Sequence, residues 1–263
     1  MGPDNASATA LEGLLQRDRW WVLAGLTATV ALCWFYLVPM SLDMYGGMSG
    51  PSRWMMVGSW DGRYFSLMLL MWAVMMAGMM LPSAAPVILL YGAVLRKSAP
   101  SAQAVPRVYA FMLGYLLAWA GFSLLATLLQ WGLSRVVLLS PMMLSRSPLL
   151  GGAILFTAGL YQWTPLKQAC LRICRSPAEF IARHWRSGLP GALRMGAGHG
   201  LFCIGCCWAL MLLLFFGGVM NLLWIAAISI AVLLEKLAPL GVQGGKLSGL
   251  LLLITGVVVA ITG

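Results

Sequence analysis

The chain has 263 residues, of which 61% are apolar and only 9% are charged, and its net charge is +10. A water-soluble domain of this length could not cover so much apolar surface, so the composition excludes a soluble globular fold. It predicts an all-α, polytopic transmembrane helical bundle, in which the positive charge faces anionic lipid headgroups rather than nucleic acid.

Long apolar blocks predict about seven membrane spans, or six if the short fourth block does not cross. A bilayer core of about 30 Å needs roughly 20 apolar residues in a helix. Residues 1–19 are then a cytoplasmic N-terminal segment, and residues 20–263 form a single transmembrane domain. In chain order, the blocks are Trp20 to Leu42, Tyr64 to Leu95, Val108 to Trp131, Pro148 to Trp163, Leu201 to Gly217, Val219 to Leu234 and Leu247 to Thr262.

The second block is too long for one straight span and contains Pro82 and Pro86. Each proline removes a backbone N–H donor and clashes one turn back, so a kinked second helix is predicted. The carbonyl groups freed at this depth must find partners in neighbouring helices, in Ser83 or in water.

The charges between the blocks predict the orientation, because short cytoplasmic loops are enriched in Lys and Arg. With seven spans, thirteen of these residues lie on one side of the membrane and four on the other. We therefore predict a multi-pass protein of the bacterial inner membrane with its N-terminus inside. A basic cytoplasmic loop is predicted at about residues 165–195, with a short amphipathic helix on the membrane surface.

Six of the 18 methionines lie close together in the second block. At 100° per residue, their side chains occupy one half of the helix surface. Thioethers select soft metals, so this methionine row is a candidate path for Cu(I); the alternative is that methionine fills space between packed helices. The six residues are Met68, Met71, Met75, Met76, Met79 and Met80. A methionine-rich outer surface is predicted from Met44, Met48, Met55 and Met56.

A histidine and three cysteines recur at helical spacing around the start of the fifth block, although four glycines between residues 196 and 205 leave the helix start open. Spacings of four, three and one residues place the imidazole and the thiols on one helix face, and side chains one turn apart suit two ligands of one ion. A further cysteine pair lies on the same predicted cytoplasmic side, where reducing conditions disfavour a disulfide. The two groups are His199, Cys203, Cys206 and Cys207, and Cys170 and Cys174.

Few other polar residues lie in or beside the predicted spans. Glu235 and Lys236, at the cytoplasmic end of the sixth block, are predicted to extend to the membrane interface. Gln162 and Asn221 are predicted to form hydrogen bonds between helices.

Three motifs stand out: residues 71–86, residues 161–167 with Cys170 and Cys174, and residues 199–211. They resemble the signature of a bacterial family of predicted metal-binding integral membrane proteins of unknown function. The resemblance extends from about residue 64 to the C-terminus. It implies a membrane-embedded fold, and the metal ligands that it implies are the methionines of residues 71–80 together with the cysteines and the histidine described above.

The leading hypothesis is that the methionine row and the Cys/His cluster bind or transfer a soft metal ion, Cu(I), across or at the membrane. Its partners would be the lipid bilayer, the ion and another membrane or metalloprotein subunit. Two alternatives stay open. Cys203 and Cys206 have the C-x-x-C spacing of a thiol-disulfide electron carrier. A structural zinc site in a scaffold subunit would use four ligands: Cys170, Cys174, Cys203 and either Cys206 or His199. The sequence contains no nucleophile elbow, phosphate-binding loop or zincin motif, so an enzyme is not favoured.

Overall fold

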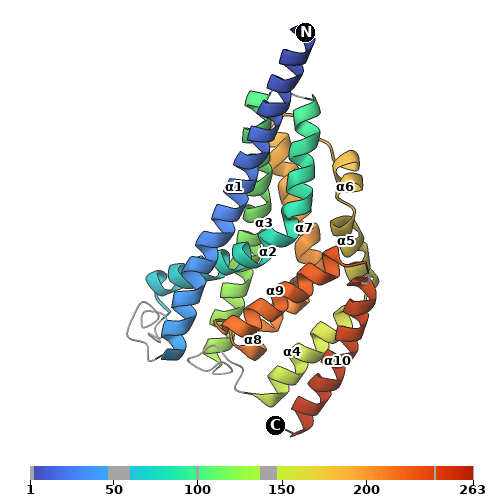
Figure 1. Cartoon of the computed structure of the whole chain (residues 1–263). Helices are drawn as coiled ribbons and strands as arrows, with labels where there is room; N and C mark the ends of the chain where they lie inside the picture. The colour runs from blue at the N-terminus through green and yellow to red at the C-terminus, as the bar shows by residue number, and fades with distance from the viewer. Residues whose placement is uncertain (1–2, 47–59, 99–100, 137–146, 240, 263) are drawn as a thin grey trace.

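The architecture is a bundle of α-helices (Figure 1). A computed structural model describes residues 3–46, 60–98, 101–136, 147–239 and 241–262. Within these ranges the chain forms helices and short connections without any strand, so the predicted all-α class is confirmed. The helices are α1 (Pro3–Gly46), α2 (Gly62–Ser98), α3 (Ser101–Arg135), α4 (Pro148–Tyr161), α5 (Pro165–Arg175), α6 (Pro177–Arg183), α7 (Gly188–Leu212), α8 (Leu214–Gly217), α9 (Leu222–Leu237) and α10 (Gly241–Thr262).

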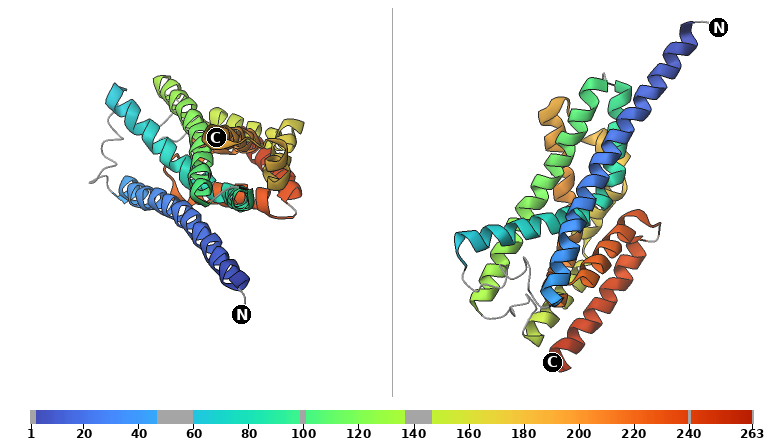
Figure 2. Two further views of the ribbon diagram at one scale, coloured as in Figure 1. Left: turned by 90° about the horizontal axis from the view of Figure 1, so that it is seen from above. Right: turned by 60° about the vertical axis from the view of Figure 1, so that its left-hand side comes forward.

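Five helical segments of the described chain are long and apolar enough to cross a membrane. The other two predicted spans are shorter, since α4 has 14 residues and α9 has 16. The count of seven spans therefore stays a prediction. The start of α1 and the end of α10 lie at opposite ends of the bundle (Figures 1 and 2). The five segments are Trp20–Met44, Gly62–Arg96, Gln103–Arg135, Gly188–Gly217 and Gly241–Thr262.

Polar caps determine where the shorter helices begin. Ser147 accepts a hydrogen bond from a backbone N–H in the first turn of α4, and Pro148 occupies that turn, where its missing N–H costs nothing. Thr164 and Pro165 begin α5 in the same way. The Asn221 side chain caps α9, so it makes a local hydrogen bond in place of the predicted bond between helices.

The long helix α2 turns sharply near its middle (Figures 1 and 2). Pro82 has no N–H, so the carbonyl of Gly78 has no partner inside the helix, and the indole N–H of Trp34 in α1 donates to it at 3.3 Å. The Ser83 hydroxyl donates to the Met80 carbonyl at 2.8 Å. The predicted kink is confirmed, and a neighbouring helix supplies the partner for the Gly78 carbonyl as expected.

Glycines bring α3 and α7 into backbone contact. A methyl group on Gly196 would lie 1.9 Å from the Phe111 carbonyl oxygen, and one on Gly114 would lie 2.0 Å from the Leu193 carbonyl oxygen. Small residues allow this close approach inside a membrane. Packing on α3 supports helical structure through the glycines of α7. The start of this helix, which the sequence did not define, lies at Gly188.

The C-terminal helix α10 packs mainly on α4, with a smaller contact to α9. Glycines of α4 again face the backbone of the neighbouring helix. A methyl group on Gly152 would lie 2.7 Å from the Gly256 carbonyl oxygen, and one on Gly159 would lie 2.7 Å from that of Gly249. This pair of helices therefore forms one side of the bundle with a narrow connection to the rest.

The predicted basic loop folds into α5 and α6. Lys167 and Leu171 of α5 are buried while Arg172 is exposed, so an amphipathic helix does form here, and its position on the membrane surface stays a prediction. The helix packs on α7 and α9, which brings its cysteines against those of α7.

Candidate metal centre

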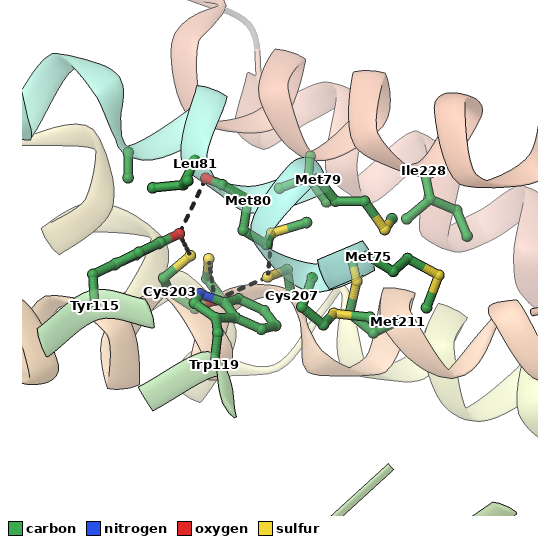
Figure 3. Close-up of a cluster of buried hydrophobic side chains, with 14 of the residues drawn as sticks. Met75, Met79, Met80, Leu81, Tyr115, Trp119, Cys203, Cys207, Met211 and Ile228 are labelled. Carbon is green, nitrogen blue, oxygen red and sulfur yellow. Dashed lines mark hydrogen bonds between the residues drawn. The ribbon is translucent and has the colours of Figure 1, made fainter. Parts of the chain in front are cut away.

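Buried sulfur atoms from α2, α5 and α7 meet beside the bend in α2. Cys203, Cys206 and Cys207 follow one another on an unbroken stretch of α7, and each is only 1% exposed. Figure 3 shows Met80 of α2 beside Cys207, with Cys203 next to it. The helical face predicted for the three cysteines therefore points into the protein interior.

Two pairs of sulfur atoms are spaced so that each could share a metal ion. Cys206 Sγ lies 4.0 Å from Cys174 Sγ of α5, and Cys207 Sγ lies 3.9 Å from Met80 Sδ. Metal–sulfur bonds of about 2.3 Å span either gap when the ion sits between the two sulfurs. All six cysteines of the chain are free thiols. The sulfurs of both pairs are thus available as ligands.

The arrangement is one of pairs rather than of a larger cage. Among the residues that the structure describes, no three His, Cys, Asp or Glu side chains are placed to hold one metal ion together. Soft sulfur pairs, one of which includes a thioether, suit Cu(I). A structural zinc site takes four protein ligands, which this geometry matches less well.

A lysine lies against the central thiol. Lys236 of α9 is 5% exposed, and its Nζ donates to Cys203 Sγ at 2.8 Å and to Ser83 Oγ at 3.0 Å. The Tyr115 hydroxyl is 3.0 Å from the same sulfur. An ammonium group this close stabilises a thiolate. The predicted extension of Lys236 to the membrane interface is wrong, because α9 ends against α2 and α7.

The neighbouring carboxylate belongs to a second buried polar cluster. Glu235 Oε2 pairs with Lys167 Nζ at 2.6 Å, and Lys167 also donates to Gln162 Oε1. Arg175 donates to the backbone carbonyl of Glu235 at 2.6 Å. The cluster joins the ends of α4 and α9 to α5, so the predicted hydrogen bond of Gln162 between helices is confirmed. The predicted interfacial position of Glu235 is wrong, because its side chain is buried in a pair with Lys167 of α5.

A family model described as PpoB2, copper chaperone, matches residues 69–259, which is more than half of the chain. The chain belongs to this copper-chaperone family. No curated protein and no solved structure matches it. Membership in the family agrees with the metal-binding part of the resemblance seen in the motifs, and it indicates copper as the metal that is handled. The matched segment contains the whole sulfur cluster.

The methionine row of this copper-chaperone family member lies in the protein interior. Met68 Sδ accepts a hydrogen bond from the Gln130 amide at 3.6 Å. Further along α2, Figure 3 shows Met75 and Met79 grouped with Met211 of α7. The row leads from the start of α2 to the sulfur cluster. All its members are at most 2% exposed: Met68, Met71, Met75, Met76, Met79 and Met80.

The predicted outer methionines are described only in part. Met44, near the end of α1, is 1% exposed and belongs to the core. Met48, Met55 and Met56 lie outside the described residues.

His199 packs among aromatic rings. Its ring lies 4.9 Å from that of Phe180 and 6.0 Å from that of Tyr115, measured between centroids. The side chain is 3% exposed, and Nδ1 has no hydrogen-bond partner within the described chain. The histidine therefore occupies an aromatic pocket one helical turn before Cys203, and its role as a metal ligand stays a prediction.

The two cysteines of α5 are half-buried. A methyl group on Gly205 would lie 2.7 Å from Cys170 Sγ, so this glycine lets α5 approach α7 closely. Hydrogen bonds with Cys203 and Cys206, together with burial, raise the pKa of the Cys174 thiol, and burial raises the pKa of Cys170. Both thiols are then protonated at neutral pH without metal, so a metal ion that binds them must displace their protons.

Tyr115, Met211 and the Ser83 hydroxyl belong to this site but were not among the residues predicted for it. A signal for Tyr115 was available, because a hydroxyl in the middle of an apolar block needs a polar partner. Its hydroxyl donates to the Met80 carbonyl at 3.1 Å and contacts Cys203. Tyr115 thus links the bent part of α2 to the thiols of α7.

Proposed function

We propose that the chain is a multi-pass protein of the bacterial inner membrane that binds Cu(I) at buried sulfur ligands and transfers it toward the cytoplasm. The proposed ligands are Cys174, Cys203, Cys206, Cys207 and Met80. Copper handling agrees with the family, and the oxidation state, the ligands and the direction are our proposals.

The observation that carries the proposal is the meeting of five sulfur side chains from three helices inside an apolar bundle. Free cysteine or methionine is common as a packing residue. Thiol pairs and thiol–thioether pairs about 4 Å apart, beside a lysine that stabilises a thiolate, are suited to binding a soft cation.

The methionine row supports a direction of transfer. Neutral thioethers bind Cu(I) without losing a proton, whereas thiolates attract the cation more strongly because they are charged. An ion that moves along α2 from Met68 toward Met80 therefore reaches stronger ligands at Cys207. With seven spans and the N-terminus inside, which the charge distribution and the opposite ends of α1 and α10 support, this path leads from the outer to the cytoplasmic side.

Replacing Cys203 or Cys206 with serine is expected to lower Cu(I) stoichiometry, because each substitution removes a soft ligand while membrane insertion depends on hydropathy. The full chain is purified in detergent, loaded with Cu(I) under reducing conditions and analysed for metal content and for Cu–S scattering by X-ray absorption. Cys33→Ser is the matched control, since Cys33 is also buried but lies apart from the cluster.

The same samples separate the alternative functions. Unchanged copper content in the Cys203→Ser/Cys206→Ser double variant contradicts the proposal. Zinc that remains through purification and exceeds bound copper would favour a structural zinc site. Thiols that oxidise reversibly without bound metal would favour an electron carrier.

A second prediction concerns the methionine row. Replacing both Met75 and Met79 with leucine preserves volume and apolarity, so the folded protein should lose less than about 1.5 kcal/mol per site. If the row conducts Cu(I), copper transfer or copper tolerance in cells should fall at unchanged protein abundance, because the bilayer offers the ion no other soft ligands nearby. Met112→Leu is a buried control in α3. Normal copper handling in the double variant would assign the row to packing alone.

A further inference from the structure

Lys236 places a cation in direct contact with Cys203, one of the proposed copper ligands. Its ammonium group lies 2.8 Å from Cys203 Sγ and is almost entirely withdrawn from solvent. A charge in such surroundings acts on neighbouring charges far more strongly than it would in water.

The groups around Lys236 come from three other helices. Ser83 of α2 accepts a hydrogen bond from it, Cys203 of α7 accepts another, and the Tyr115 hydroxyl of α3 contacts the same sulfur. On its own helix, the Glu235 carboxylate is directed to Lys167 instead. Within the described chain, Lys236 therefore has no carboxylate at ion-pair distance, and its hydrogen-bond partners are Cys203 Sγ and Ser83 Oγ.

We propose that Lys236 makes this site select a monovalent soft ion over a divalent one. The inference rests on the proposed function, because it concerns an ion bound at the cysteine cluster. Coulomb repulsion scales with the charge of the ion, so Lys236 repels a divalent cation twice as strongly as a monovalent cation at the same position. The thiolates attract both ions whether or not the lysine is present. The direction in which Lys236 shifts the selectivity between the two ions therefore does not depend on how many thiolates bind.

The test compares Ag(I) with Cd(II), two soft closed-shell ions that differ in charge. The purified full chain in detergent is titrated with both ions in competition, and the ratio of bound Ag(I) to bound Cd(II) is measured for the parent protein and for its variants. Lys236→Met should shift this ratio toward Cd(II) by at least about tenfold, because it removes the repulsive charge. Lys236→Arg retains the charge and should leave the ratio within about threefold of the parent.

Lys236→Gln keeps hydrogen-bond donors for Ser83 and Cys203 without the charge, so it provides a second neutral variant if Lys236→Met fails to fold. It should show the same shift toward Cd(II). Ser83→Ala removes a hydrogen bond to Lys236 without changing the charge and should not shift the ratio. Failure of the parent to bind Cu(I) or Ag(I) would contradict the proposed function. Binding by the parent with an unchanged ratio in the neutral variants would overturn the selectivity inference alone.

Discussion

Replacing Lys167 with methionine is expected to lower the free energy of unfolding by about 3–5 kcal/mol. The substitution keeps the apolar stem but leaves the Glu235 carboxylate without its ionic partner, at a position where the two side chains are only 1% and 8% exposed. An unpaired buried charge is costly because it has lost its hydration without compensation. The stability is measured by titrating the detergent-solubilised protein with SDS.

Two controls separate this effect from a general loss of charge. The double variant Lys167→Met/Glu235→Leu removes both ions and should recover most of the lost stability. Arg183→Met breaks the exposed pair of Arg183 with Glu179 and should change stability by less than about 1 kcal/mol. Equal losses in the Lys167 and Arg183 variants would contradict the importance of the buried pair.

A valine at Gly196 is expected to destabilise the bundle by about 3 kcal/mol or more. The added Cβ would lie 1.9 Å from the Phe111 carbonyl oxygen, which belongs to the backbone of α3 and cannot move aside like a flexible side chain. The helix α7 would have to shift, and its cysteines would shift with it. We expect reduced yield of folded protein, and reduced Cu(I) stoichiometry in any folded fraction.

Gly198 supplies the matched control, because a Cβ there meets no atom within 4 Å. Gly198→Val makes the same chemical change in the same helix, so differences of helix propensity cancel between the two variants. If Gly196→Val and Gly198→Val unfold alike, close packing of α3 on α7 does not limit stability.

The sequence was sufficient for features that depend on local spacing. The helical class follows from the apolar blocks, the kink in α2 follows from Pro82, and the shared face of the α7 cysteines follows from their spacing. The placement of Cys174 beside Cys206 was anticipated only in the zinc alternative, which makes cysteines of both groups ligands of one ion.

Features that depend on how distant segments pack were not predictable in this way. Lys236 has the sequence context of an interfacial lysine, and only the packing of the short helix α9 against α2 and α7 buries it. His199 shares the helical spacing of the cysteines, but aromatic side chains from α3 and α6 enclose its ring. Hydropathy alone also cannot decide whether helices as short as α4 and α9 cross the membrane.

The enclosure of the α7 thiols has a consequence for the speed of metal exchange. Cys203, Cys206 and Cys207 are each 1% exposed, so an ion bound at the proposed site would be closed to an incoming ligand until the protein opens. Exchange is then limited by a conformational step, and the residence time of the ion reports the frequency of opening rather than the strength of its bonds to sulfur. Cys170 and Cys174 are more exposed than these three, so movement of α5 away from α7 is the shortest route by which another protein's ligands could reach the ion.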